Sequence, residues 1–357
     1  MRGVTAELLA RGHKVSVFEP ADSWSRSNLV REHGLGAIEA FHAAFRALKS
    51  TYYDLASFDI EQALAGVDLV LVHEWNDLKL VAAAGQFRRR NAGVRLFFHD
   101  THHRAVTAHE ELSRFDLSEY DGVLAYGASL KEAYLRHGWG RQVHVWQEAA
   151  DTRTFFPRAA DGDKAGVVWI GNWGDEERTE ELREYVLGPI SRARLTATAY
   201  GVRYPAYALQ ELSAAGIQFA GWLPNFKAPE VFAGFKATVH VPRRPYARDL
   251  PGIPTIRPFE ALACGIPLIS APWRDSESLF RIGRDFLMAH DGNEMERHLK
   301  TVLLEPSLAA TLRANGLETI RTRHTCAHRV DELLKIYGHT QRQSACRNEA
   351  ALAGVSP

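Results

Sequence analysis

Short apolar runs alternate with amphipathic stretches along most of the chain. The apolar runs suit buried strands of about four to eight residues, and the stretches between them repeat apolar positions with the period of a helix. In the first half, the expected strands are 14–18, 68–73, 94–98, 122–126 and 142–146. The expected helices there are 2–10, 37–50, 78–90 and 129–136.

The second half continues the same alternation. Its expected strands are 165–170, 193–200, 217–219, 237–241, 267–270 and 285–288. Its expected helices are 176–187, 204–215, 228–234, 256–264, 276–280, 295–304 and 308–321. Alternating strands and helices are typical of βαβ units, so the predicted fold class is α/β, with two Rossmann-like, doubly wound parallel sheets.

A segment rich in proline, glycine and charge at residues 151–166 separates the two halves. We predict an N-terminal domain over 1–150, a linker over 151–166 and a C-terminal domain over 167–322. A last helix over 323–338 and a loose tail over 339–357 follow. Doubly wound sheets bind ligands beyond the carboxyl ends of their strands, so two of them facing each other predict a cleft.

The start of the chain departs from the Rossmann pattern. Residues 2–10 are predicted to be a helix, whereas such a domain begins with a strand that lies centrally in its sheet. A missing central strand leaves backbone groups on both neighbouring strands without partners. We therefore expect that the first domain lacks its first strand, and that the true start of the protein lies upstream.

Composition narrows the function. Lys and Arg number 43 and Asp and Glu number 43, and this balance argues against a nucleic-acid partner. No apolar run approaches the roughly 18 residues of a membrane helix, and no signal peptide opens the chain, which leaves only peripheral membrane contact open. Three cysteines make no disulfide framework, so we expect a cytoplasmic protein.

The segment 242–273 concentrates the candidate binding chemistry. A helix is expected to begin near Thr255 and Ile256, and its free amides form a site for an anion. Glu260, one turn later, can accept hydrogen bonds from two ribose hydroxyls, as acidic residues do in dinucleotide sites. In the alternative interpretation, the arginines of this segment coat a solvated loop, and Glu260 caps the first turn of the helix. The segment carries Arg243, Arg244, Arg248 and Arg257, and arginine forks complement phosphate oxygens in geometry and charge.

A second candidate segment, VVWIGNWGDEER at 167–178, runs from a strand into a glycine turn and an acidic helix start. Gly171 and Gly174 let the backbone approach a ligand closely. Asp175, Glu176 and Glu177 suit the positive end of a helix. The alternative is a plain turn between strand and helix.

Candidate catalytic residues lie in the first half. The strand in RLFFHDTHHR (95–104) ends at His99 and Asp100, and a His beside an Asp can serve as an oriented general base. Glu74 follows the preceding strand and can meet an acceptor hydroxyl or cap the next helix. The histidines can also be packing or surface residues. Their spacing matches no named metal motif, so no metal is predicted.

The residues FEALACGIPLIS (259–270) resemble the donor-site signature of GT-B glycosyltransferases, E-A-x-A-x-G-x-P, and PTIRPFEALACG resembles the bacterial spore-maturation-protein (CgeB) branch. The resemblance extends over most of 1–338. It implies that a nucleotide-sugar donor is held mainly by the C-terminal domain, and that the last helix crosses back onto the first domain. Many retaining members carry a further glutamate eight positions before the matching one, where this chain has Gly252.

The resemblance also implies roles for single residues. Glu260 would hold the ribose, and Arg257 with the amides near Thr255 and Ile256 would face the diphosphate. Trp222, in Gly-Trp-Leu-Pro, would lie near the base or belong to the core. The loop after the first strand of the C-terminal domain would contact the donor phosphates through Gly171, Asn172 and Trp173.

The sequence therefore predicts a metal-independent, hexosyltransferase-like glycosyltransferase that needs no cofactor beyond its nucleotide-sugar donor. Arg243, Arg244 and Arg257 would stabilise the leaving diphosphate. His99, Asp100 and Glu74 would orient the acceptor or take its proton. The acceptor, whether glycan, protein or small molecule, is not specified. Two alternatives remain: an inert GT-B-like binding or scaffold protein, and a nucleotide-sugar epimerase.

Overall fold

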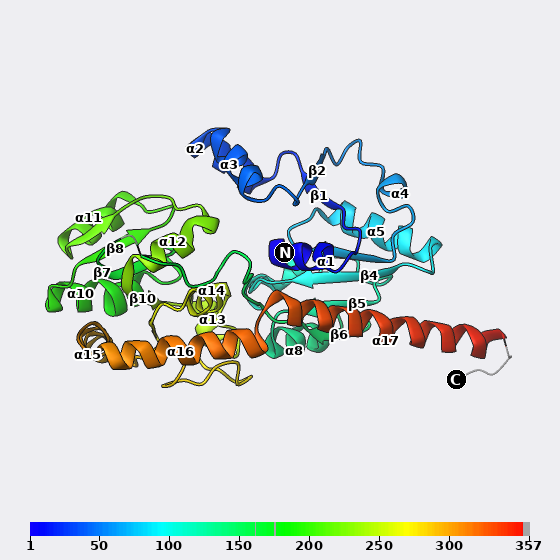
Figure 1. The fold of residues 1–357 in the computed structure, drawn as a ribbon. Coiled ribbons are helices and arrows are strands. Elements are labelled where there is room, and N and C mark those ends of the chain that lie inside the picture. The colour runs from blue at the N-terminus through cyan, green and yellow to red at the C-terminus, as the bar shows by residue number, and fades with distance from the viewer. Residues whose placement is uncertain (161, 175, 353–357) are drawn as a thin grey trace. The chain divides into compact units, whose positions relative to one another are not determined.

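The computed structural model describes residues 1–160, 162–174 and 176–352, which divide into two compact units (Figure 1). The first unit is Met1–Gln147 together with the chain from Ala327 onward, and the second is Glu148–Cys326. Most of the expected linker is irregular chain that belongs to the second unit. Residue 161 of that linker, Asp175 of the acidic helix start and 353–357 of the expected tail lie outside the described residues.

Parallel strands form two separate sheets in the first unit. The strands are β1 (Val17–Pro20), β2 (Ser50–Tyr53), β3 (Leu69–His73), β4 (Arg95–Asp100), β5 (Gly122–Ala125) and β6 (Val143–Val145). β1 pairs with β2, and the other sheet has the order β3-β4-β5-β6. Within the described residues no ladder joins the two sheets.

Helices surround these sheets. They are α1 (Arg2–Ala10), α2 (Trp24–His33), α3 (Gly36–Ala44), α4 (Ile60–Ala63), α5 (Leu78–Arg90), α6 (Arg104–Thr107), α7 (His109–Leu112) and α8 (Ala128–His137). The helix predicted over 37–50 was too long, because 50–53 forms β2 instead. β2 exists through its pairing with β1, where the Ser50 hydroxyl donates to Glu19 at 2.7 Å. This long-range pairing overrides the local pattern.

The second unit has one fully parallel sheet. Its strands are β7 (Ala165–Ile170), β8 (Ala197–Tyr200), β9 (Ile217–Phe219), β10 (Phe235–His240), β11 (Leu268–Ser270) and β12 (Leu287–Met288). The order is β12-β11-β10-β7-β8-β9, which is the doubly wound order of a Rossmann fold. The chain leaves β7 toward one edge and returns through β10 toward the other. β7 and β10 therefore flank the switch point, where such sheets bind ligands.

The helices of this unit cover both sides of the sheet (Figure 1). They are α9 (Thr179–Leu182), the π-helix η1 (Arg183–Leu187), α10 (Gly188–Ala193), α11 (Ala206–Ala214), the 3-10 helix η2 (Asn225–Lys227), α12 (Ala228–Ala233), α13 (Arg244–Arg248), α14 (Ile256–Cys264), α15 (Gly292–Leu304) and α16 (Pro306–Arg323). The helix predicted over 276–280 was wrong. Ser278 has a φ of 52°, and the Asp275 carboxylate accepts from the amides of Leu279 and Phe280, which makes a tight turn.

The last helix, α17 (Cys326–Leu352), returns to the first unit and passes beneath its strands in Figure 1. The indole of Trp146, just after β6, donates to the carbonyl of Arg329 at 2.8 Å. The tail predicted to be loose from 339 is helical to Leu352, in part because Thr340 is buried and Gln343 accepts from Gln142 at 2.8 Å.

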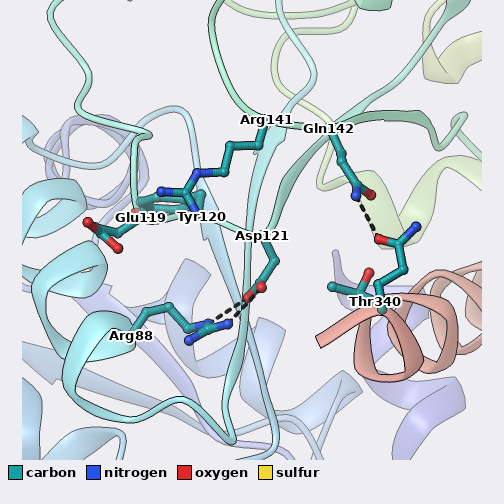
Figure 2. A pocket seen from close by; sticks show the side chains of 8 residues that line it. Arg88, Glu119, Tyr120, Asp121, Arg141, Gln142 and Thr340 are labelled. Atoms are coloured by element: carbon teal, nitrogen blue, oxygen red, sulfur yellow. Dashed lines mark hydrogen bonds and ion pairs between the residues drawn. The ribbon is translucent and has the colours of Figure 1, made fainter. Parts of the chain in front are cut away.

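A small polar pocket opens where α17 meets the amino ends of β5 and β6. Figure 2 shows the Arg88 guanidinium bound to Asp121 through two hydrogen bonds, at 2.7 and 2.8 Å. The lining residues are Arg88, Glu119, Tyr120, Asp121, Arg141, Gln142, Thr340 and Gln343. The pocket lies at the opposite end of the strands from His99 and Asp100. It belongs to the docking of α17 rather than to the candidate catalytic residues.

Candidate functional site

Arg178 bridges the loops that follow β7 and β10. Its Nη1 donates to the carbonyl of Val241 at 2.9 Å, and its Nη2 donates to the carbonyl of Asn172 at 2.6 Å. The buried Nε makes no hydrogen bond within the described residues. Burial, reinforced by the charges of Arg243 and Arg257, lowers the pKa of Arg178 to about 10. A half-buried cation therefore lies across the switch point, and its Nε–H lacks an acceptor among the described residues.

Two further arginines join the same loops through ion pairs. Arg243 contacts Glu177 at 3.0 Å, and Arg244 binds both carboxylate oxygens of Glu181, at 2.9 and 3.1 Å. The backbone amide of Arg244 also donates to the carbonyl of Glu177. The predicted cations Arg243 and Arg244 therefore lie beside the switch point, but each carries its own carboxylate partner. Their contacts clamp the two loops together.

Helix α14 begins in a strained conformation. Its N-cap, Thr255, has φ 64° and ψ 179°, a region that almost only glycine adopts. No side chain of the described residues caps the helix, and the amides of its first turn point out of the N-terminus without an intrahelical acceptor. Such an end attracts anions. The predicted residues Thr255 and Ile256 thus stand where an anion can be bound.

Glu260 lies on the first turns of α14 and is 4% exposed. One carboxylate oxygen accepts from the Asn225 side chain at 2.9 Å, and the other pairs with Arg257 at 2.5 Å. These two contacts fix the orientation of the carboxylate. Each oxygen still has a further lone pair that can accept a hydroxyl proton.

His240, the last residue of β10, is buried beneath the same loop. Its Nδ1 lies 2.9 Å from the Ser270 hydroxyl, and the ring also contacts the carbonyl of Pro254. Burial, with the charges of Arg178 and Arg257, lowers the pKa of His240 to about 3. The imidazole is therefore neutral at physiological pH and connects β10, β11 and the chain entering α14.

The turn after β7 contacts the hydrophobic core as well as the loops at the switch point. The carbonyl of Gly171 accepts from the Tyr204 hydroxyl at 2.7 Å, and the Asn172 side chain accepts from the amide of Val202 at 3.3 Å. Trp173 is 2% exposed and packs near Tyr204, so its ring belongs to the hydrophobic core. The contact of this loop with the donor phosphates through Gly171, Asn172 and Trp173 stays a prediction. Trp222 is half-buried.

In the first unit, His99, Asp100 and Glu74 come together at the carboxyl ends of β3 and β4, and all three are buried. Asp100 accepts from the Tyr134 hydroxyl at 2.7 Å and from the amide of His102 at 2.9 Å. Burial and the neighbouring Glu74 raise the pKa of Asp100 to about 7. Asp100 thus holds its surroundings together and is partly protonated near neutral pH.

Glu74 is the charged centre of this cluster. One oxygen lies 3.1 Å from His73 and 3.6 Å from Arg104, and the other accepts from the hydroxyl of Thr101 at 3.2 Å. His99 packs edge-on against the His73 ring, and burial lowers its pKa well below the usual value. The Nδ1 atom of His99 makes no hydrogen bond within the described residues. His99 is therefore a neutral imidazole.

Comparison with known proteins shows which family model and which solved structures this chain resembles. Residues 178–335 match the family model described as glycosyl transferase-like. No curated protein sequence matches the chain. The fold resembles Anabaena Alr3699/HepE, solved in complex with UDP and glucose, with a TM-score of 0.65 and 14% identity over 94% of this chain and 95% of that chain.

Two other solved structures are similar. A glycosyltransferase from Rickettsia africae ESF-5 has a TM-score of 0.65 and 10% identity, covering 95% of this chain and 94% of that one. Sucrose-phosphate synthase (tll1590) from Thermosynechococcus elongatus has a TM-score of 0.58 and 16% identity, covering 88% and 80%. This chain has the GT-B fold of glycosyltransferases. Its narrower resemblance to the CgeB type stays a prediction.

Within the GT-B fold, the sequence pattern places most donor-site candidates in one region, but it misses the buried partners. His240 and Asn225 give no sequence signal, because their roles arise only when β10 and η2 lie beside α14. Arg178 follows the glycine turn after β7, and that position is the only hint of its role. In the described residues, no three His, Cys, Asp or Glu side chains are grouped to hold a metal ion. No helix among them is long and apolar enough to cross a membrane.

Proposed function

We propose that this GT-B chain transfers a sugar from a nucleoside diphosphate sugar to a hydroxyl-bearing acceptor. The observation that carries the proposal is Arg178, a half-buried cation at the switch point whose buried Nε makes no hydrogen bond within the described residues. It is electrostatically coupled to Arg257, on the first turn of α14. A diphosphate supplies the negative charge and the acceptor oxygens that such an arrangement lacks.

The proposed reaction requires that the leaving group, the nucleoside diphosphate, be stabilised. As the bond between the anomeric carbon and the diphosphate oxygen breaks, negative charge grows on the departing nucleoside diphosphate. Arg178, Arg257 and the amides at the start of α14 are already oriented and partly desolvated, so they stabilise that charge with little rearrangement. We propose that this charge is neutralised without a metal ion.

The remaining donor contacts follow from chemistry. The fixed carboxylate of Glu260 accepts hydrogen bonds from the ribose hydroxyls. The backbone of Gly171 and Asn172 lines the turn beside the phosphates. Arg243 and Arg244 hold the two loops together through Glu177 and Glu181, which makes them positioning residues.

The first unit supplies the acceptor side in this proposal. The acceptor hydroxyl loses its proton as its oxygen bonds to the anomeric carbon. His99, Asp100 and Glu74 combine a neutral imidazole, a carboxyl group that titrates near pH 7 and a carboxylate held by Arg104. We propose that this cluster orients the acceptor and receives the proton.

A ligand screen tests the donor assignment. Bound ligand stabilises the folded state by mass action, so UDP, GDP and dTDP with their hexose conjugates are screened by thermal shift. Hydrolysis and transfer assays with the nucleotide sugars that bind then distinguish a glycosyltransferase from an epimerase and from a scaffold protein. Release of free sugar or transfer supports an enzyme, conversion of one donor sugar to another supports an epimerase, and binding without turnover supports a scaffold. If none of the nucleotides stabilises the chain, the proposed donor site is contradicted.

Arg178 provides the sharpest test of the site itself. Arg178→Ala and Arg178→Lys should weaken binding of the preferred nucleoside diphosphate by about 10- to 100-fold, because charge-assisted hydrogen bonds to phosphate are lost. Arg248→Ala is the matched control, because Arg248 is an exposed arginine on α13. The affinity of this variant for the nucleoside diphosphate should change by less than about twofold. Equal affinities of the two alanine variants by calorimetry would show that Arg178 does not bind the diphosphate.

A further inference from the structure

A tyrosine hydroxyl links strand β7 to the turn that follows it. Tyr204 lies in the loop after β8, the strand that pairs with β7. Its hydroxyl accepts from the indole N–H of Trp169, on β7, at 2.8 Å and donates to the carbonyl of Gly171 at 2.7 Å. Burial raises the pKa of Tyr204 to about 12, so the hydroxyl keeps its proton and remains a donor at physiological pH.

The same indole also supports Arg178. The guanidinium lies over the Trp169 ring, 5.1 Å from its centroid, and one of its nitrogens donates to the carbonyl of Asn172, next to Gly171. A cation over the face of an indole is attracted by the quadrupole of the ring. Trp169 therefore contacts the cation through its face and reaches the turn through Tyr204.

Close packing holds this relay in one arrangement. A Cβ atom added to Gly171 would lie 2.6 Å from the Trp169 ring, so the turn can approach the indole only with a glycine there. The rings of Trp173 and Phe219 pack against Tyr204, at 5.7 and 4.7 Å between ring centroids. The packed ring fixes the place of the hydroxyl, and the hydroxyl in turn fixes the Gly171 carbonyl.

Such a relay suits a site that must be ready before its ligand arrives. Preorganised groups stabilise a developing charge because they need no rearrangement at that moment, and linked buried hydrogen bonds strengthen each other. We propose that Tyr204 is a positioning residue that, together with Trp169, holds the Gly171–Asn172 turn and Arg178 in the arrangement that binds the donor diphosphate. This rests on the proposed function, in which Arg178 contacts the diphosphate. Tyr204 acts through these groups and does not itself touch the ligand.

Tyr204→Phe tests the relay because it removes the hydroxyl and keeps the packed ring. The Trp169 indole and the Gly171 carbonyl then both lose a hydrogen-bond partner. Calorimetry on the full chain with UDP, or with GDP if guanine is preferred, should show about 5- to 10-fold weaker binding, and inorganic pyrophosphate should weaken by a similar factor. Trp169→Phe removes the other end of the relay and should weaken both ligands in the same direction.

The matched control is Tyr207→Phe, which removes a hydroxyl from a tyrosine on α11 that is 39% exposed. It should change the affinity for either ligand by less than about twofold. An equal loss in Tyr207→Phe and Tyr204→Phe would show that the relay has no special role, and this would overturn the assignment.

A double-mutant cycle and a spectroscopic signal separate positioning from a general loss of stability. In an Arg178→Ala background, Tyr204→Phe should cost less than about twofold in further affinity, because the cation that it positions is already gone. The indole N–H resonance of Trp169, assigned by its absence in Trp169→Phe, should shift when the diphosphate is added to the parent chain, because Arg178 lies over the ring.

The outcomes distinguish this assignment from the proposed function. Unchanged affinity for both ligands in Tyr204→Phe overturns the assignment, and so does a loss that is fully additive with that of Arg178→Ala. An indole resonance that does not respond to the diphosphate also overturns it. A parent chain that binds no nucleoside diphosphate, or an Arg178→Ala variant that binds it as the parent does, overturns the proposed function instead.

Discussion

Two buried carboxyl groups show how the surroundings of a residue set its role. Glu260 is held between an amide and a guanidinium and keeps lone pairs for a ligand. Asp100 uses both oxygens on Tyr134 and the amide of His102, and its neighbour Glu74 disfavours its charge. The first arrangement is suited to binding, whereas the second resembles a structural group that can also move a proton.

Glu260→Ala should separate the ribose from the phosphates. If the carboxylate holds the ribose, the variant should bind UDP about 10-fold more weakly, while its affinity for inorganic pyrophosphate stays the same. Calorimetry with both ligands measures the difference. A parallel loss of pyrophosphate binding would show instead that Glu260 acts by positioning Arg257.

Asp100 should make the first unit less stable as pH rises. Its pKa is raised from 3.8 to about 7 on folding, so the native state binds the proton more tightly than the unfolded state. The free energy of unfolding of the parent chain, taken relative to that of Asp100→Asn, is highest below about pH 4. As the pH rises from 4 toward 7, this difference falls by up to about 1.4 kcal/mol per pH unit. Urea unfolding of both proteins across this range measures it. A difference that is constant with pH would contradict the raised pKa.

Single elements show which parts of the sequence pattern are sufficient. Helix α14 has the predicted bounds, Ile256–Cys264, because its apolar face repeats every three to four residues and Gly265 ends it in a left-handed conformation. The helix predicted over 276–280 is absent because one side chain, Asp275, captures the amides of the turn. Local periodicity decides long elements, whereas short ones depend on individual hydrogen bonds.

The start of α14 should hold measurable strain. Thr255→Gly removes the side chain from a conformation that almost only glycine adopts, so it should raise the free energy of unfolding by about 1 kcal/mol after the entropy cost of glycine. Chemical denaturation measures the change. Thr196→Gly is the control, because Thr196 is exposed and has no positive φ, and it should be destabilising. A destabilised Thr255→Gly variant would mean that the threonine side chain is needed there.

At the scale of the whole molecule, one helix ties the end of the chain to its first unit. Val330 and Leu333 of α17 are fully buried, and Arg11, the C-cap residue of α1, pairs with Asp331 at 2.6 Å. The first unit is therefore built from both ends of the sequence. Its stability depends on residues that follow the second unit in the chain.

Leu333→Ala should destabilise the first unit by about 2–5 kcal/mol, because it leaves a cavity under α17. Hydrogen exchange should show lost protection in β4 and β5, with β7 and β10 unchanged. Leu304→Ala, at a position that is 78% exposed, is the control and should cost less than about 0.5 kcal/mol. Loss of protection in both units alike would show that they unfold together.

The sequence by itself determined the α/β class, the division into two doubly wound parts, helix α14 and the choice of Glu260 and Arg257 as residues of interest. These follow from periodicity and from residue types at short spacing. Only the tertiary structure brought Arg178 to Val241 and His240 beneath the chain that enters α14. Parallel strands gather the loops at their carboxyl ends whatever their separation in the chain, and that convergence is not encoded in any local pattern.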